Sequence, residues 1–284
     1  MLASESSTRE AQADIQAALR GGTVDLRLTQ CQLVNVYSGE ICRTQIAIRG
    51  RRIVAIRSEF DGEAGQTIDC RNQYVIPGYI EPRAVLGEGG VRLADCPRLG
   101  VTSVISRAGD EFGDAGSRPV GPVPHHFQEA RAIGAPLAGG PTVVRVVHRI
   151  QRDCVTQVQD ELIQAMREGR AVIVDIPADA GERHALLSVA SRLAKGASNL
   201  IIRQFGPARR EDGRSALADL LAAGLGVAEA VRMTCLNAAI HYGIDHEVGG
   251  IVPGRLADLL VYRSLTDERP AMVILGGQVV TTAA

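Results

Sequence analysis

The chain has 284 residues, a formal net charge of −1 and a sequence pI of about 6.6. This balance excludes an extended basic surface, so we expect no nucleic-acid partner. No apolar run reaches membrane-spanning length and the N-terminal segment is polar, so we expect no membrane partner and a cytoplasmic location. The six cysteines form no CxxC pair, and a chain of this size needs no disulfides to fold, which favours free thiols.

Both ends of the chain have the pattern of β-strands. A short amphipathic helix is expected at 8–19, and apolar, β-branched runs between turn signals then predict strands. The expected strands lie at 24–28, 32–36, 45–48, 52–56, 67–69, 257–261, 272–275 and 279–281. Because a different kind of sequence separates the two groups, we predict that 1–75 and 250–284 together form one small composite β-sandwich domain.

The intervening residues, 76–249, alternate between strand and helix patterns. Strands are expected at 76–80, 101–106, 142–148, 171–176 and 199–203, and helices at 91–99, 155–168, 182–195, 213–223 and 227–241. Such alternation predicts parallel βα units. The segment 106–141 is rich in Gly, Pro and charge, so it is expected to be a long loop.

Three segments resemble the amidohydrolase superfamily, and adenine deaminases in particular. They are VNVYSGE at 34–40, VIPGYI at 75–80, and the stretch 228–261, which contains AEAVRMTCLNAA and GGIVPGRLADLLV. The resemblance implies a metal-dependent hydrolase built on a βα barrel, with its chemistry at the carboxyl ends of the strands. It also implies that the helix–strand–helix pattern over 155–193 is part of that barrel.

Carried over residue by residue, the resemblance implies that the metal site has been lost. The family's first-strand histidine pair falls on Arg83 and Val85, and the aspartate of the last barrel strand falls on Gln204. Arginine is a fixed cation and valine has no lone pair, so neither can bind a divalent ion. We therefore expect no cofactor and a catalytically degenerate protein; the alternative is a divalent metal (Zn, Fe or Mn) bound at other residues.

Size leads to the same expectation. A complete barrel of eight βα units takes roughly 250 residues, whereas only five strands are expected between 76 and 249. The predicted fold class is thus α/β: a truncated TIM-type amidohydrolase barrel remnant plus the composite β domain. A shortened barrel exposes apolar edges, so we expect a homo-oligomer or a partner protein that covers them.

Several other side chains are candidates for a relocated site. His148 and Asp175 end neighbouring strands and form a possible catalytic remnant, although a surface histidine is the simpler interpretation. His125 and His126 are alternative metal ligands together with His148, but adjacent residues of a strand diverge. An active enzyme of this kind would hydrolyse a C–N bond in a purine or a cyclic amide, and a purine sensor without turnover is a third possibility.

Arginines near strand ends form another candidate group. Arg83, Arg107 and Arg203, with Arg209 and Arg210, would bind an anion if they converged, although solvated charge is the simpler interpretation. By contrast, Cys154 and Cys235 have no evident activating neighbour and are interpreted as buried thiols.

Overall fold

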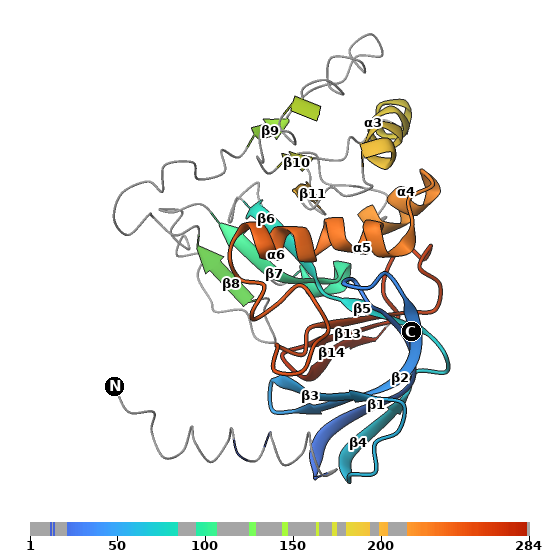
Figure 1. The fold of residues 1–284 in the computed structure, drawn as a ribbon, viewed down its shortest axis with the longest axis vertical. Coiled ribbons are helices and arrows are strands. Elements are labelled where there is room, and N and C mark those ends of the chain that lie inside the picture. Colours follow the sequence, from blue (N-terminus) through green and yellow to red (C-terminus); the bar gives the residue numbers. More distant parts are fainter. Residues whose placement is uncertain are drawn as a thin grey trace.

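A computed structural model gives the structure of the chain. It describes residues 12, 14, 22–84, 95–106, 125–128, 144–146, 163–164, 172–174, 180–193, 199–203 and 215–282. In this part the chain forms one eight-stranded sheet, two three-stranded sheets and helices that pack against them (Figure 1). No helix in it is long and apolar enough to span a membrane.

Strands from both ends of the chain make up the eight-stranded sheet. They are β1 (Val24–Val34), β2 (Ile41–Arg49), β3 (Arg52–Arg57), β4 (Ala64–Asp69), β5 (Tyr74–Pro77), β12 (Leu259–Tyr262), β13 (Met272–Leu275) and β14 (Gln278–Thr282). Their order is β14-β13-β12-β5-β1-β2-β3, and β4 also pairs with β1. The joint between the two ends is β5, which is parallel to β1 and antiparallel to β12. The blue and dark red ribbons of Figure 1 therefore lie together.

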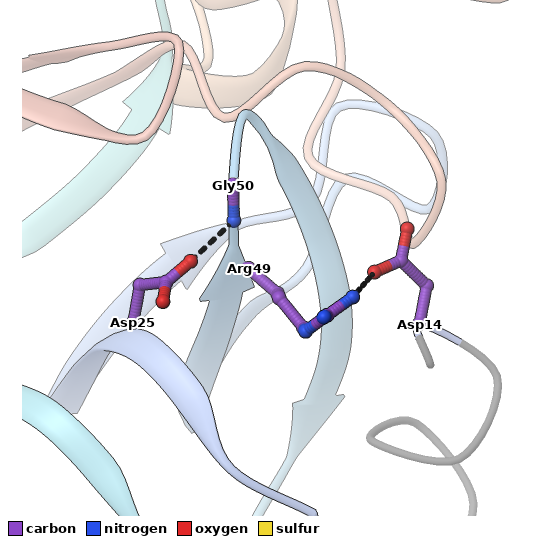
Figure 2. A network of polar contacts seen from close by, with 4 residues as sticks. All are labelled: Asp14, Asp25, Arg49 and Gly50. Carbon is purple, nitrogen blue, oxygen red and sulfur yellow. Dashed lines mark hydrogen bonds and ion pairs between the residues drawn. The ribbon is translucent and has the colours of Figure 1, made fainter. Parts of the chain in front are cut away.

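The sheet curls until its β3 edge meets the segment that leads into β12. Arg52 forms an antiparallel bridge with Leu256, and the amide of Ala257 donates to the Arg51 carbonyl at 2.8 Å. At the turn that precedes β3, the Arg49 side chain pairs with Asp14 at 2.7 Å and the Asp25 carboxylate accepts the Gly50 amide (Figure 2). These contacts connect the turn to Asp14 in the N-terminal segment and to Asp25 in β1.

Two of the predicted strand boundaries are wrong. The segments 24–28 and 32–34 belong to the single strand β1, which continues through a bulge beside Gln30, where φ is +53°, and 35–36 lie beyond its end. Conversely, the strand expected at 76–80 divides at Gly78 into β5 and β6, which belong to different sheets. A Cβ at Gly78 would overlap the Thr102 side chain, so the change of sheet takes place at a residue without a side chain.

The two three-stranded sheets are parallel throughout. One has the order β6-β7-β8, with β6 (Tyr79–Ala84), β7 (Val101–Ser106) and β8 (His125–Gln128). The other has the order β11-β10-β9, with β9 (Val144–Val146), β10 (Val172–Val174) and β11 (Leu200–Ile202). Strand β8 lies inside the segment 106–141, which was expected to be a loop. Four residues are too few to show a strand periodicity in the sequence, and the strand is defined by its pairing with β7.

The helices are α3 (Ala180–Leu193), α4 (Ala216–Ala222), α5 (Val227–Thr234), α6 (Leu236–His241) and the 3₁₀ turn η1 (Pro97–Leu99). The single helix expected at 227–241 is broken at Cys235, whose φ of −141° lies outside the helical range. Of the helix expected at 91–99, the described residues 95–99 contain the 3₁₀ turn η1, and 91–94 lie outside the described residues. Ser215 caps α4 by accepting the Ala218 amide at 3.2 Å.

One apolar cluster joins the two parallel sheets. It contains four isoleucines, one each from β6, β7, β10 and β11, which pack with Ala238 and Ala239 of α6. The isoleucines are Ile80, Ile105, Ile173 and Ile201. Because each of the four strands contributes a buried side chain to the same cluster, the two sheets share an interior in the manner of a βα barrel.

Candidate functional site

An ion pair links the first parallel strand to the last one described. Glu81 is the third residue of β6, and Arg203 directly follows β11. The Arg203 Nε and Nη2 atoms each lie 2.8 Å from Oε1 of Glu81. Glu81 is 0% exposed and Arg203 is 5% exposed. Two opposite charges 122 residues apart in the chain are thus buried against each other.

The surroundings of this pair explain its chemistry. Burial costs both charges their hydration, and the short, double contact to one oxygen works against this cost. Nearby, burial raises the pKa of the Cys96 thiol, and the negative charge of Glu81 raises it further. The Arg203 guanidinium is therefore bound to the Glu81 carboxylate. Oε1 of Glu81 in turn contacts a cation that stays protonated at any ordinary pH.

A divalent metal needs a donor set of several His, Cys, Asp or Glu side chains. No group of three His, Cys, Asp or Glu side chains suited to an ion occurs among the residues that the structure describes. At the positions to which the sequence resemblance assigns the histidine pair, Arg83 offers a cation and Val85 a hydrocarbon. A catalytic metal requires several neutral imidazoles or carboxylates around an open position, and these residues do not fit it.

Most of the predicted site residues are not brought together by the described part of the chain. Arg83 lies in β6, of which only the backbone is described at this position. His125 and His126 lie in β8, where their backbone partners in β7 are Ser103 and Val104. The remaining candidates lie outside the described residues: Val85, Arg107, His148, Cys154, Asp175, Gln204, Arg209 and Arg210.

Arg203 is the predicted anion-binding residue whose environment is described most fully. Its anionic partner is Glu81, from within the chain, so its charge is not displayed on the surface as the sequence interpretation assumed. Sequence reasoning did not single out Glu81. The available signal was a carboxylate that directly follows the apolar run 75–80, since a charge in such a strand is buried only when it is paired.

The other titratable side chains considered from the sequence lie in the interior, on helices or in a turn. Cys235 is buried, its thiol donates to the Val231 carbonyl at 2.9 Å, and burial raises its pKa to about 12. His241 packs edge-on against Tyr242, with ring centroids 4.7 Å apart. His184 is exposed on α3, and His246 lies in a turn after α6.

The comparisons with known proteins concern both sequence and fold. The profile of the amidohydrolase family matches residues 155–280. Adenine deaminase from Desulforamulus reducens is 21% identical over 348 aligned positions, which cover 94% of this chain and 59% of that protein. Adenine deaminase from Kosmotoga olearia is 44% identical over 69 residues, 24% of this chain and 12% of that protein. The chain thus spans less than two thirds of the length of these relatives.

Solved structures show the same fold. The crystal structure of an adenine deaminase aligns with a TM-score of 0.61 and 17% identity, over 90% of this chain and 99% of that chain. A β-aspartyl dipeptidase from Fervidobacterium islandicum aligns with a TM-score of 0.61 and 13% identity, over 89% and 96% of the two chains. The fold is therefore an α/β fold of the amidohydrolase type. In sequence the chain is similar to adenine deaminases of the amidohydrolase superfamily.

Proposed function

We propose that this chain is a catalytically degenerate, adenine deaminase-like amidohydrolase that acts as a structural, regulatory or partner-binding subunit. The observation that carries the proposal is the buried Glu81–Arg203 ion pair. Its carboxylate, Glu81, lies in β6 just before Arg83 and Val85. The family resemblance assigns metal-binding histidines to those two positions. The Glu81 carboxylate is already bound to a fixed cation, which disfavours a divalent metal at this oxygen.

We also propose that the barrel is truncated internally and rests on a composite β-sandwich formed by 1–75 and 250–284. The alignment with the Desulforamulus enzyme has 348 positions, which exceeds the 284 residues of the chain, so parts of that enzyme face gaps here. The strands of both chain ends in one sheet support the composite domain. Missing βα units would leave strand edges and apolar faces to be covered by a second copy or by another protein.

Metal content tests this proposal directly. The full chain, purified without a histidine tag, is analysed by inductively coupled plasma mass spectrometry and by light scattering, and ammonia release from adenine is assayed. We expect far less than one metal per chain, no ammonia, and an assembly larger than one chain. One or two tightly held metals per chain would overturn the proposal, and so would turnover of adenine.

A second candidate is an active amidohydrolase that uses a relocated site for a C–N bond in a purine or cyclic amide. The observation in its favour is that β8 places His125 and His126 beside β7 in a parallel sheet. With His148 they would supply imidazole ligands, and Asp175 a carboxylate. In that case His148→Ala would lower the metal content and the hydrolytic rate together, whereas His184→Ala on the exposed face of α3 would change neither.

A further inference from the structure

Two cysteine thiols meet inside the eight-stranded sheet. The Sγ atoms of Cys31 and Cys70 are 3.7 Å apart, although 39 residues separate them in the chain. Their residues are 0% and 2% exposed, and both thiols are free. A disulfide requires the sulfur atoms to approach to about 2.05 Å, so small side-chain rotations would bring the pair within bonding distance.

The backbone holds both cysteines beside the same turn. Cys31 lies in β1 directly after its bulge, and Cys70 directly follows β4, which is parallel to β1. The Cys70 amide donates to the Thr29 carbonyl at 2.9 Å, and the Asn72 amide donates to the Gln30 carbonyl at the same distance. These bonds fix the two residues relative to each other.

Unfavourable backbone conformations are concentrated around the pair. The non-glycine residues with positive φ in the described part of the chain are Gln30, Arg71 and Asn72, at +53°, +51° and +61°. Gln30 precedes Cys31, and the other two follow Cys70. Side chains with a Cβ rarely adopt such values, and these conformations cluster at functional and switching segments because the surroundings must enforce them.

The two thiols have different roles in the contact. The Cys31 thiol donates to Cys70 Sγ, which lowers the pKa of Cys70, while the same bond and burial raise the pKa of Cys31. Cys70 is therefore the thiol that ionises first, and the thiolate is the nucleophile. Its neighbours in the sequence, Asp69 and Arg71, are exposed, so the buried Cys70 lies beside a solvent-exposed turn.

We propose that Cys31 and Cys70 are a redox-modification site that forms a reversible disulfide with hydrogen peroxide as the oxidant. The Cys70 thiolate attacks one peroxide oxygen, the O–O bond breaks, and the departing hydroxide takes up a proton to become water. Cys31 sulfur then attacks the sulfenic acid of Cys70, the S–O bond breaks, and the hydroxyl leaves with the Cys31 proton as a second water. Two thiols and one peroxide thus yield one disulfide and two waters.

Peptide mapping of the folded full chain tests the site. Cleavage after arginine yields one peptide, 28–43, that contains both Cys31 and Cys42, and another, 58–71, that contains Cys70. The exposed Cys42 must therefore be removed, and a Cys42→Ser chain is the starting protein. After peroxide treatment, blocking of thiols and digestion without reductant, we expect 28–43 and 58–71 as one linked species that dithiothreitol separates.

Two controls make the result specific. Dimedone labels sulfenic acids. After peroxide treatment it should label Cys70 in the Cys31→Ser/Cys42→Ser chain, but it should not label Cys31 in the Cys70→Ser/Cys42→Ser chain. Cys96 and Cys235, whose pKa values are raised by burial, serve as internal controls and should stay reduced. The linked peptides should appear in the Cys42→Ser chain even if the core variants fail to fold. Persistence of reduced Cys31 and Cys70, or oxidation of Cys96 and Cys235 at the same rate, would overturn the proposal.

Thermal unfolding provides an independent readout. A disulfide that closes a loop of this length restricts the unfolded chain, so the oxidised Cys42→Ser protein should melt about 5–10 °C higher than its reduced form. Dithiothreitol should abolish the difference. An unchanged or lower melting temperature in the cross-linked protein would contradict a site built to accept the bond.

Discussion

Tyr79 and Tyr262 are 183 residues apart in the chain, yet their hydroxyl oxygens lie 2.8 Å from each other in the interior. Tyr79 begins β6 of the parallel sheet, and Tyr262 ends β12 of the eight-stranded sheet. Burial raises the pKa of both phenols, so they stay neutral, and Ser215 at the start of α4 also bonds to them. One hydroxyl cluster therefore connects the two sheets and a helix.

Removal of one member of this pair should destabilise the fold. Tyr262→Phe leaves the Tyr79 hydroxyl without its phenol partner, and we expect a loss of about 1–2 kcal/mol in the free energy of unfolding. The double variant Tyr79→Phe/Tyr262→Phe should lose less than the sum of the single variants, because no phenol is then left half-satisfied. Urea unfolding of the four proteins measures the coupling, and strict additivity would show that the contact contributes nothing.

The Glu81–Arg203 pair gives a larger expected effect. Arg203→Met leaves a carboxylate buried without its cation, which costs about 3–5 kcal/mol, and Glu81→Gln should also be costly. The double variant Glu81→Leu/Arg203→Met replaces both charges by hydrocarbon and should recover most of the loss. Urea midpoints of the three variants decide: a double variant no more stable than Arg203→Met would mean that packing, rather than charge, dominates.

Gly78 should tolerate no side chain. Gly78→Ala would force a Cβ into Oγ1 and Cγ2 of Thr102, so we expect a loss of about 1–3 kcal/mol from overpacking. In a Thr102→Ala background these two atoms are absent, and the same substitution should cost less. Thermal unfolding of the four proteins checks this, and an equal cost in both backgrounds would contradict the steric explanation.

Stability should fall at alkaline pH. Burial raises the pKa of Cys235 from 9.0 to about 12, so between these values the unfolded chain loses a proton that the folded chain keeps. The free energy of unfolding therefore decreases as pH rises through this window, by about 1.4 kcal/mol per unit for one such group. Urea unfolding at pH 7.5, 9 and 10.5 measures the slope.

A variant assigns the slope to its source. Cys235→Ala should be less stable at neutral pH but should show a shallower alkaline decline. Cys42→Ala, which removes an exposed thiol, should keep the slope of the unmodified chain. Identical slopes in all three proteins would mean that other groups, such as the buried Tyr79 and Tyr262, control the alkaline limb.

The sequence predicted whether a segment is a helix or a strand better than it predicted where the element begins and ends. Apolar runs such as 199–203 identified buried strands because burial on both faces needs continuous hydrocarbon. The division of 76–80 could not be predicted, because it depends on Thr102, a residue that is distant in the sequence and close only in the fold. The break between α5 and α6 is similar, since 227–241 keeps a helical pattern through Cys235.

The sequence indicated Arg203 as a candidate site residue but not its partner. The loss of metal ligands at Arg83 and Val85 stays a prediction, which depends on the register set by Pro77 and Gly78. The partner of Glu81 could not be inferred, since local patterns do not specify which strand ends adjoin across 122 residues. The Cys31–Cys70 contact was missed for the same reason, because it requires the parallel pairing of β4 with β1.

The position of β5 has a consequence for the order in which the chain folds. This strand pairs with β1 on one side and with β12 on the other. The edge of β5 that faces β12 therefore has no partner until residues 259–262 have been synthesised. A ribosome adds roughly 5–20 residues each second, which leaves the edge of β5 uncovered for about 10–40 s. During that interval the nascent N-terminal strands present an open template for wrong pairing, and chaperone binding there would protect the chain until its last strands arrive.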